Sequence, residues 1–206
     1  MGLIKKASEL TVKSTISALI YGQPGIGKTT LALSAPNAVL FDYDGGVHRV
    51  NAAHRGATVE INSWDDTSAV LASEEIKEFD TIVIDTAGKM LDFMSADIIA
   101  RSKNKTPGRK LALNEYGERK AMFISFLKAV SMMGKNVVFV AHEREEKNGE
   151  EKQIRPEIGG SSAGDLIKEL DLVGYMEAIG KEKTISFDPC EKFYGKNTCN
   201  LPSIIK

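Results

Sequence analysis

The segment "YGQPGIGKTT" (21–30) constrains the fold of this chain most, because it fits the pattern Gly-x-x-x-x-Gly-Lys-Thr. It follows the apolar, β-branched run 14–22, which predicts a strand, and it enters residues 28–35, which predict a helix ending at Pro36. A glycine-rich turn in that place lets successive backbone N–H groups converge on phosphate oxygens. A glycine turn with a chance lysine is the alternative, which the strand–turn–helix context disfavours. The sequence therefore predicts a site for the phosphates of a nucleotide.

The loop and the first turn of its helix carry the side chains expected at such a site. Lys28 would add a mobile positive charge, and the Thr29 hydroxyl would bind Mg²⁺. A metal at this place also needs a carboxylate, and Asp85 supplies one at the end of the apolar strand predicted over 80–88. The alternative for Asp85 is a polar residue that only marks the end of the strand. The predicted nucleotide-binding residues are Gly22, Pro24, Gly25, Ile26, Gly27, Lys28, Thr29 and Thr30.

Predicted strands and helices alternate along most of the chain. Further strands are predicted at 38–44, 57–61 and 135–143, and helices at 63–79, 90–100 and 118–134, the first with Ser63 as N-cap and Asp66 at its third position. Residues 101–117 form a polar connection, 144–164 a mobile surface loop, and the end of the chain alternates like a hairpin. This order predicts an α/β fold with a doubly wound, mainly parallel sheet and a C-terminal antiparallel hairpin. We expect one domain over 1–206, with an N-terminal arm at 1–15 and a C-terminal extension at 172–206.

Charge and cysteine content narrow the possible partners and compartments. The 206 residues include 27 basic and 28 acidic side chains, so any nucleic-acid contact must come from a local patch. Cys190 and Cys199 lack metal-ligand spacing, and a reduced pair is favoured over a disulfide because nothing indicates secretion. No apolar run is long enough to span a membrane. We expect a cytoplasmic protein without membrane contact.

Two other predicted strands also end in polar residues. "LFDYDGG" places Asp42 and Asp44 before two glycines, and "VVFVAHE" places His142 and Glu143 after its apolar run. In parallel α/β sheets the ligand lies beyond the carboxyl ends of the strands. The ordered set "LIYGQPGIGKTT…LFDYDGG…TIVIDT…VVFVAHE" resembles the RecA-type ATPase core. From about residue 16 onward, the chain is similar to small phage-encoded RecA-like ATPases associated with single-strand annealing and recombination.

This resemblance implies cofactors, partners and residue roles. The cofactors would be ATP and Mg²⁺, and the partners single-stranded DNA, further copies in a ring or filament, and a single-strand-binding protein. A phage origin would place the chain in the cytoplasm of a bacterial host. Asp44 falls where the family has the glutamate that activates water, and His142 where it has a sensor of the γ-phosphate. The alternatives are a turn cap for the first and a merely hydrogen-bonded strand end for the second.

The segment "YGKNTCNLP" resembles a hairpin by which RecA-like subunits reach the nucleotide of their neighbour. Lys196 matches that hairpin, whereas Thr198 stands where an arginine is expected. The resemblance therefore implies that Lys196 acts in trans and that hydrolysis is slow. A solvated lysine in a turn is the alternative.

A local excess of basic residues lies where the RecA-like order has its first DNA-binding loop. Its predicted nucleic-acid-binding residues are Arg101, Lys103, Lys105, Arg109 and Lys110. A solvated loop beside a charged helix face is the alternative. The second candidate loop, 143–157, has more acidic than basic residues, which is unfavourable for a phosphate backbone.

Three functions remain open at this stage. The first is an ATP-binding RecA-core protein that binds single-stranded DNA and promotes annealing and recombination, with slow Mg²⁺-dependent ATP hydrolysis. The second is a small nucleoside or nucleotide kinase, whose arginine-rich lid the segment 101–110 could imitate, although that segment holds mostly lysines. The third is a nucleotide-gated DNA-binding module without turnover.

Overall fold

One mixed sheet organises the molecule. The computed structural model describes residues 6, 14–106, 108–149 and 151–206, so most of the expected N-terminal arm lies outside the described residues. Within them, the sheet has ten strands in the main order β10-β8-β7-β1-β5-β4-β2-β3, with β6 paired to β5 and β9 to β7. Within this order, the strands from β7 to β3 are all parallel to one another. The predicted doubly wound, mainly parallel sheet is confirmed.

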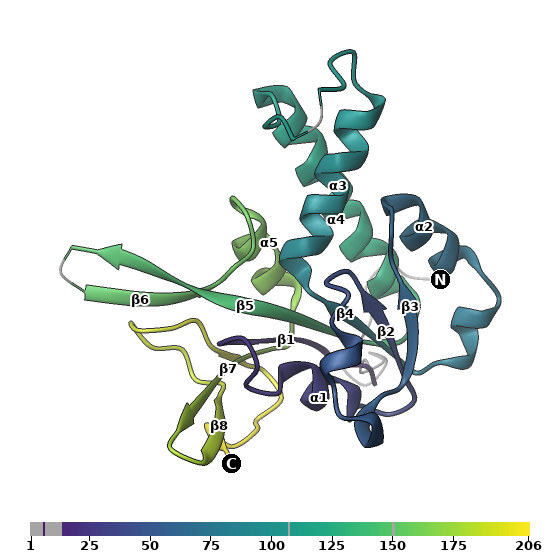
Figure 1. Ribbon diagram of the computed structural model, residues 1–206. Coiled ribbons are helices and arrows are strands. Elements are labelled where there is room, and N and C mark those ends of the chain that lie inside the picture. The colour runs from purple at the N-terminus through teal and green to yellow at the C-terminus, as the bar shows by residue number, and fades with distance from the viewer. Residues whose placement is uncertain (1–5, 7–13, 107, 150) are drawn as a thin grey trace.

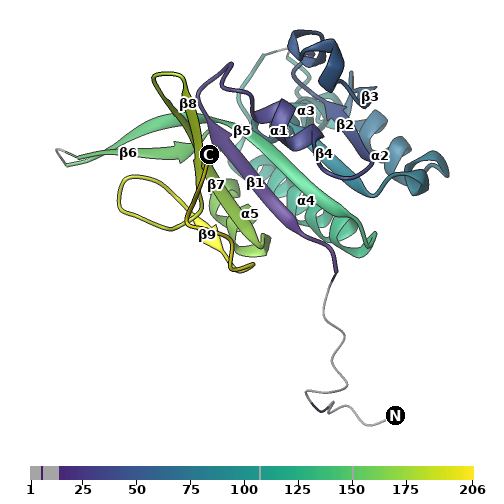
Figure 2. The same ribbon diagram turned by 90° about the horizontal axis from the view of Figure 1, so that it is seen from below.

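The parallel strands fall close to the apolar runs of the sequence, and β3, at the end of the strand order, has no fully buried residue. They are β1 (Ser17–Gly22), β2 (Ala38–Asp42), β3 (Ala57–Glu60), β4 (Thr81–Asp85), β5 (Asn136–Asn148) and β7 (Leu172–Ile179). Figure 2 shows β1 running beside β5. Strand β5 lies between β1, which leads into the phosphate loop, and β4, which ends at Asp85.

Helices cover both faces of this sheet, which explains why its strands are apolar at successive positions. The helices are α1 (Lys28–Leu33), α2 (Trp64–Ala72), α3 (Ala87–Arg101), α4 (Leu113–Met132) and α5 (Ser162–Glu169). Leu19 and Tyr21 of β1 pack in the large core with the apolar faces of α3, α4 and α5. Ile20, between them, faces the smaller core beneath α1. Strand alternation thus divides one apolar run between two cores.

Helix boundaries follow local capping more closely than they follow apolar periodicity. Ser63 and Asp66 form the predicted capping box at the start of α2, with Oγ of Ser63 3.3 Å from the Asp66 nitrogen. The helix ends at Ala72 instead of residue 79, and a short 3₁₀ helix, Glu75–Glu78, follows it. Strand β4 ends at Asp85, three residues before the predicted limit, because Thr86 caps α3. Two further 3₁₀ turns, Val47–Arg49 and Ala52–His54, follow β2.

Two antiparallel hairpins project from the sheet (Figure 1). Helices α3 and α4 pack together, and residues 102–106 and 108–112 lie at their tip. Helix α4 begins five residues before its predicted start at 118. The second projection corrects the predicted surface loop at 144–164: β5 continues to Asn148 and pairs with β6 (Glu151–Pro156). The charged residues of these strands resemble a surface loop in the sequence. An ion pair of 3.0 Å between Lys152 and Glu145 connects the two strands.

The C-terminal hairpin is continuous with the central sheet. Strand β7 pairs in parallel with β1 and antiparallel with β8 (Glu182–Ser186). Short strands β9 (Lys196–Asn197) and β10 (Ile204–Ile205) complete this side. The predicted antiparallel C-terminal hairpin is therefore present, and it adjoins the strand that leads into the phosphate loop. No helix in the described part of the chain is long and apolar enough to cross a membrane.

Candidate nucleotide site

The phosphate loop connects β1 to α1 in a conformation that its glycines make possible. A Cβ atom added to Gly22 would lie 2.1 Å from the carbonyl oxygen of Met176 on β7, so no side chain fits there. Gly27, directly before α1, has φ of 108°, in the left-handed region that favours glycine. The glycines predicted for close backbone approach therefore keep the loop against the sheet.

Lys28 is the most deeply placed charge of the loop. Its side chain is 5% exposed, and Nζ donates hydrogen bonds to the carbonyl oxygens of Gly22, at 2.9 Å, and Gln23, at 2.6 Å. Burial lowers the pKa of the Lys28 ammonium, and the carboxylates of Asp85 and Glu143 oppose that shift. A phosphate beside it would also favour the charged form. Backbone carbonyl groups of the phosphate loop therefore fix the position of the Lys28 ammonium.

Thr29 and Asp85 meet across the base of the loop. Oγ1 of Thr29 donates to Oδ2 of Asp85 at 2.6 Å, and Asp85 is almost fully buried. Burial raises the pKa of Asp85 and the nearby Asp42 and Asp44 add to the rise, while the threonine hydroxyl opposes it. A hydroxyl and a carboxylate side by side are the oxygen ligands that Mg²⁺ prefers, so these residues fit the metal that the phosphate loop implies. A bound Mg²⁺ would supply positive charge to the phosphates.

The two aspartates after β2 have separate places. The buried Asp42 accepts hydrogen bonds from the backbone nitrogens of Asp44, Gly46 and Val47 at 3.2, 3.1 and 3.0 Å. It is therefore the turn cap. Asp44 lines the cavity above the phosphate loop, and its Oδ2 lies 3.4 Å from Nη1 of Arg49.

His142 lies at the same cavity, on the strand between the phosphate loop and Asp85. Its Nδ1 is buried and has no hydrogen-bond partner among the residues that the structure describes. A buried ring nitrogen without a partner is uncommon and suits a site completed by a ligand. The predicted role of His142 as a sensor of the γ-phosphate stays a prediction.

The cavity has a volume of about 320 Å³, within the usual range for a small-molecule site. Most predicted loop residues line it, but Gly22 and Ile26 do not: the first holds Lys28 and the second packs in the core beneath α1. Arg49, Val50 and Asn51 line it without having been predicted. Arg49 ends the first 3₁₀ turn after β2, Val50 and Asn51 connect it to the second, and no motif marks these residues.

Lys196 lies elsewhere within its own chain. Its Nζ donates to the carbonyl oxygens of Ile167 and Lys168 at 3.0 and 3.1 Å, which caps the C-terminal end of α5. Strand β9 also pairs with the beginning of β7, whereas the cavity lies beyond the ends of the parallel strands. The predicted action of Lys196 on a neighbouring subunit stays a prediction.

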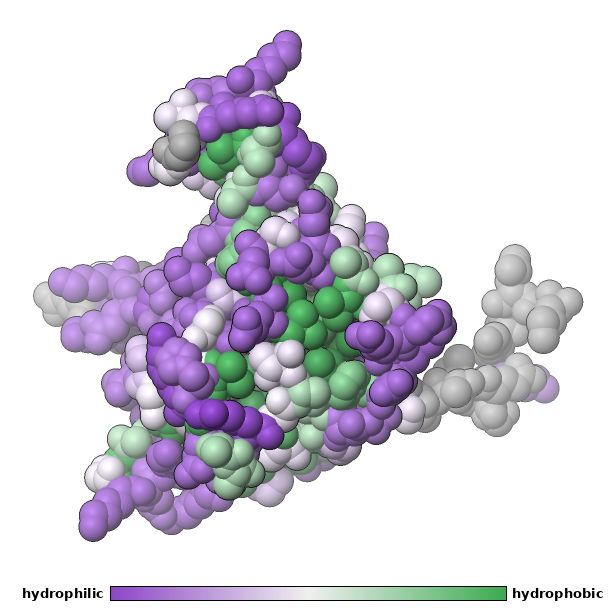
Figure 3. All heavy atoms as spheres, turned by 45° about the vertical axis from the view of Figure 1, so that its right-hand side comes forward, coloured by the Kyte–Doolittle hydropathy of each residue, from purple (hydrophilic) through white to green (hydrophobic). Residues whose placement is uncertain are grey.

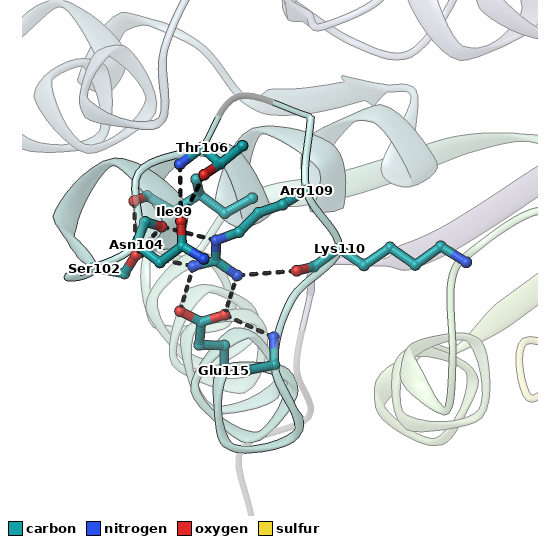
Figure 4. Close-up of polar contacts among 8 residues, drawn as sticks. Ile99, Ser102, Asn104, Thr106, Arg109, Lys110 and Glu115 are labelled. Atoms are coloured by element: carbon teal, nitrogen blue, oxygen red, sulfur yellow. Dashed lines mark hydrogen bonds and ion pairs between the residues drawn. The ribbon is translucent and has the colours of Figure 1, made fainter.

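The basic residues between α3 and α4 divide into two groups. Arg101 pairs with Asp97 at 2.7 Å and with Glu118 at 3.0 Å. Arg109 makes a bidentate pair with Glu115, both distances being 2.6 Å, and also donates to Ser102 at 2.9 Å (Figure 4). These two arginines therefore stabilise the tip.

Lysines supply the exposed charge of this tip. Lys103, Lys105 and Lys110 are all exposed, and in Figure 4 the side chain of Lys110 extends away from the arginine cluster. Figure 3 shows the projecting tip covered mostly by hydrophilic side chains. Tyr116 is 43% exposed on the first turns of α4, with the Arg119 guanidinium 5.2 Å from its ring centre. Exposed lysines and an exposed tyrosine are side chains that proteins use to bind single-stranded nucleic acids.

A phosphate loop on a parallel sheet, with Asp85 at the base and His142 beside it, defines a nucleotide-binding domain of the P-loop class. The sequence matches the family model described as the AAA domain over residues 14–199, and the chain belongs to that family. Among solved structures it is similar to the crystal structure of the RadB recombinase, with a TM-score of 0.51 and 14% identity over 83% of this chain and 79% of that one. This likeness confirms a RecA-like fold. No curated protein sequence matches the chain.

Proposed function

We propose that this protein binds ATP with Mg²⁺, hydrolyses it slowly, and uses the nucleotide to control binding and annealing of single-stranded DNA. The observation that carries the proposal is the meeting of Lys28, Asp85, Asp44 and His142 at one cavity, from positions on or shortly after four neighbouring strands of the sheet. One chain then carries the lysine that would bind the phosphates, the carboxylate that would bind the metal, and two residues that would act at the terminal phosphate. The resemblance to recombination ATPases and the likeness to the RadB recombinase support the DNA part.

The proposed hydrolysis needs a base and a positive charge at the γ-phosphate. The oxygen of a water molecule attacks phosphorus, its proton passes to the Asp44 carboxylate, and the bond to the bridging oxygen of ADP breaks. Lys28 stabilises the negative charge on the phosphate oxygens, and His142 contacts the transferred group. Arg49 forms an ion pair with one oxygen of the Asp44 carboxylate that would accept the proton, which agrees with slow turnover.

The proposed DNA contact is the tip of the α3–α4 hairpin. Lys103, Lys105 and Lys110 would neutralise phosphates of the strand, and Tyr116 offers a face for a base. A ring or filament of several copies would align successive tips along one strand. A single-strand-binding protein would compete for that strand or deliver it to the tips.

A kinase would need arginines of this same segment to converge on a second substrate. Arg101 and Arg109 are instead held by carboxylates of α3 and α4. The ion pairs therefore favour the DNA-binding proposal over phosphoryl transfer to a nucleoside.

The proposal is tested by measuring phosphate release from ATP, with and without single-stranded DNA, together with annealing of complementary oligonucleotides. We expect slow release that DNA accelerates, annealing that needs ATP, and loss of both in Lys28→Ala. Transfer of phosphate to a nucleoside, without DNA binding even at low salt, would contradict the proposal. ATP-dependent DNA binding with no phosphate release would replace hydrolysis by nucleotide gating alone.

A further inference from the structure

A second lysine reaches the phosphate loop from the C-terminal hairpin. Nζ of Lys183, on β8, lies 3.3 Å from the position that a Cβ atom of Gly27 would occupy. The backbone of Gly27 is part of the loop that surrounds the phosphates in the function proposed above. Lys183 is exposed to solvent, whereas Lys28 is buried within the loop.

Packing of the hairpin determines where Lys183 lies. Strand β8 pairs antiparallel with β7, which places Lys183 opposite Ala178 and Ile185 opposite Met176. A Cβ atom on Gly174 of β7 would lie 2.5 Å from Cδ1 of Ile185, so this close contact requires glycine. Ile185 is buried in the core beneath α1, and Lys183, two residues away, projects from the same face of the strand. The register that buries the isoleucine therefore brings the lysine to the phosphate loop.

In the part of the chain that the structure describes, the positive charge of Lys183 is not balanced by an ion pair. The neighbouring Glu182 pairs with Lys206 at 2.8 Å. Within the described ranges of the chain, no carboxylate lies within ion-pair distance of Lys183. A cation without a partner beside a loop built for anions is suited to an anionic ligand.

We propose that Lys183 contacts the phosphate chain of the bound nucleotide from within the same subunit. The inference rests on the nucleotide binding proposed above and assigns a further residue to that site. Lys183 would strengthen binding of ATP and ADP alike, because the loop beside it surrounds the phosphates that the two nucleotides share. It would supply, in cis, positive charge of the kind that the sequence assigned to Lys196 of a neighbouring subunit.

The test compares dissociation constants for ATP and ADP in the wild type, Lys183→Gln and Lys183→Arg. The matched control is Lys181→Gln, which removes an exposed lysine two residues away, in the turn of the same hairpin. We expect Lys183→Gln to weaken binding of both nucleotides about fivefold or more, and to make binding less sensitive to salt. Lys183→Arg should retain most of the affinity, and Lys181→Gln should bind as the wild type does.

The outcomes separate this inference from the proposed function. If Lys28→Ala loses ATP binding while Lys183→Gln keeps the affinity of the wild type, the contact is wrong and the nucleotide site stands. If Lys181→Gln weakens binding as much as Lys183→Gln, the effect is one of general charge and the inference is also wrong. If the wild type binds no nucleotide, the proposed function itself fails. Thermal unfolding of each variant checks that the exposed substitutions leave the fold intact.

Discussion

Asp42 and Asp44 show how the fold gives different roles to two residues of one type that lie two positions apart. The Asp42 side chain is buried, and its oxygens accept hydrogen bonds from three backbone N–H groups. Asp44 faces the cavity with Arg49 beside it. The apolar pattern alone could not distinguish the two, and only the family resemblance gave Asp44 a role of its own.

Substitution of these two aspartates should therefore separate catalysis from stability. Asp44→Asn should lower phosphate release about 100-fold or more while ATP still binds, because the general base is lost. Asp42→Asn should lower the free energy of unfolding by about 1–3 kcal/mol, because its neutral amide replaces a charged acceptor of three hydrogen bonds. Single-turnover hydrolysis and urea unfolding measure the two effects. Unchanged hydrolysis by Asp44→Asn would remove that residue from the mechanism.

Gly22 offers a second prediction at the scale of one residue. Gly22→Ala places a methyl group 2.1 Å from the Met176 carbonyl oxygen, which should lower the free energy of unfolding by about 2 kcal/mol or more. The control is Gly117→Ala in α4, where no atom lies within 4 Å of the added Cβ. That substitution should instead raise stability by about 0.5–1 kcal/mol, because alanine favours helix. Equal unfolding midpoints for the two variants would contradict the close packing of the loop on β7.

At the scale of elements, the tip of the α3–α4 hairpin depends on one ion pair. The Arg109 guanidinium and the backbone N–H of Ala112 lower the pKa of Glu115 from its ordinary value of 4.5 to about 2. A carboxyl group whose pKa is lower in the folded protein stabilises it fully above the unfolded value and loses this effect as the pH falls toward the folded value. The tip should therefore lose order between about pH 4.5 and pH 2.

This pH dependence can be followed by NMR signals of residues 102–112. In the wild type these signals should shift together over the stated range, whereas in Glu115→Gln they should show the altered tip already at neutral pH. Lys128→Gln, an exposed change elsewhere on α4, is the control and should behave as the wild type. A tip in Glu115→Gln that keeps the wild-type signals at neutral pH would show that the pair does not organise it.

The same tip carries the prediction for DNA. Replacing Lys103, Lys105 and Lys110 together by glutamine should weaken single-stranded DNA binding and make the slope of log affinity against log salt less negative by about 2, since each phosphate contact contributes about 0.7. Fluorescence anisotropy at several salt concentrations measures the slope. A control triple variant removes three exposed lysines elsewhere, Lys128, Lys181 and Lys192. A slope that changes equally in both variants would place the DNA elsewhere.

At the scale of the whole molecule, the sequence predicted the central sheet and the phosphate site because both depend on local patterns. The runs before Gly22 and Asp85 are apolar at successive positions, as strands buried on two faces must be. The β5–β6 hairpin was missed because its charged residues resemble a loop until the strands are paired. Arg49 was missed because the packing of a 3₁₀ turn brings it to the cavity, and Lys183 because the register of β8 brings it beside the phosphate loop. No sequence motif marks either residue.

The central claim is that the cavity and the helical hairpin act together, so that the bound nucleotide sets the affinity for DNA. The most direct test is the dissociation constant for a labelled single-stranded oligonucleotide, measured with and without Mg²⁺ and ATP, for the wild type and Lys28→Ala. The account predicts tighter DNA binding with ATP in the wild type and no response to ATP in Lys28→Ala. Equal DNA affinity with and without ATP in a wild-type protein that binds the nucleotide would contradict it.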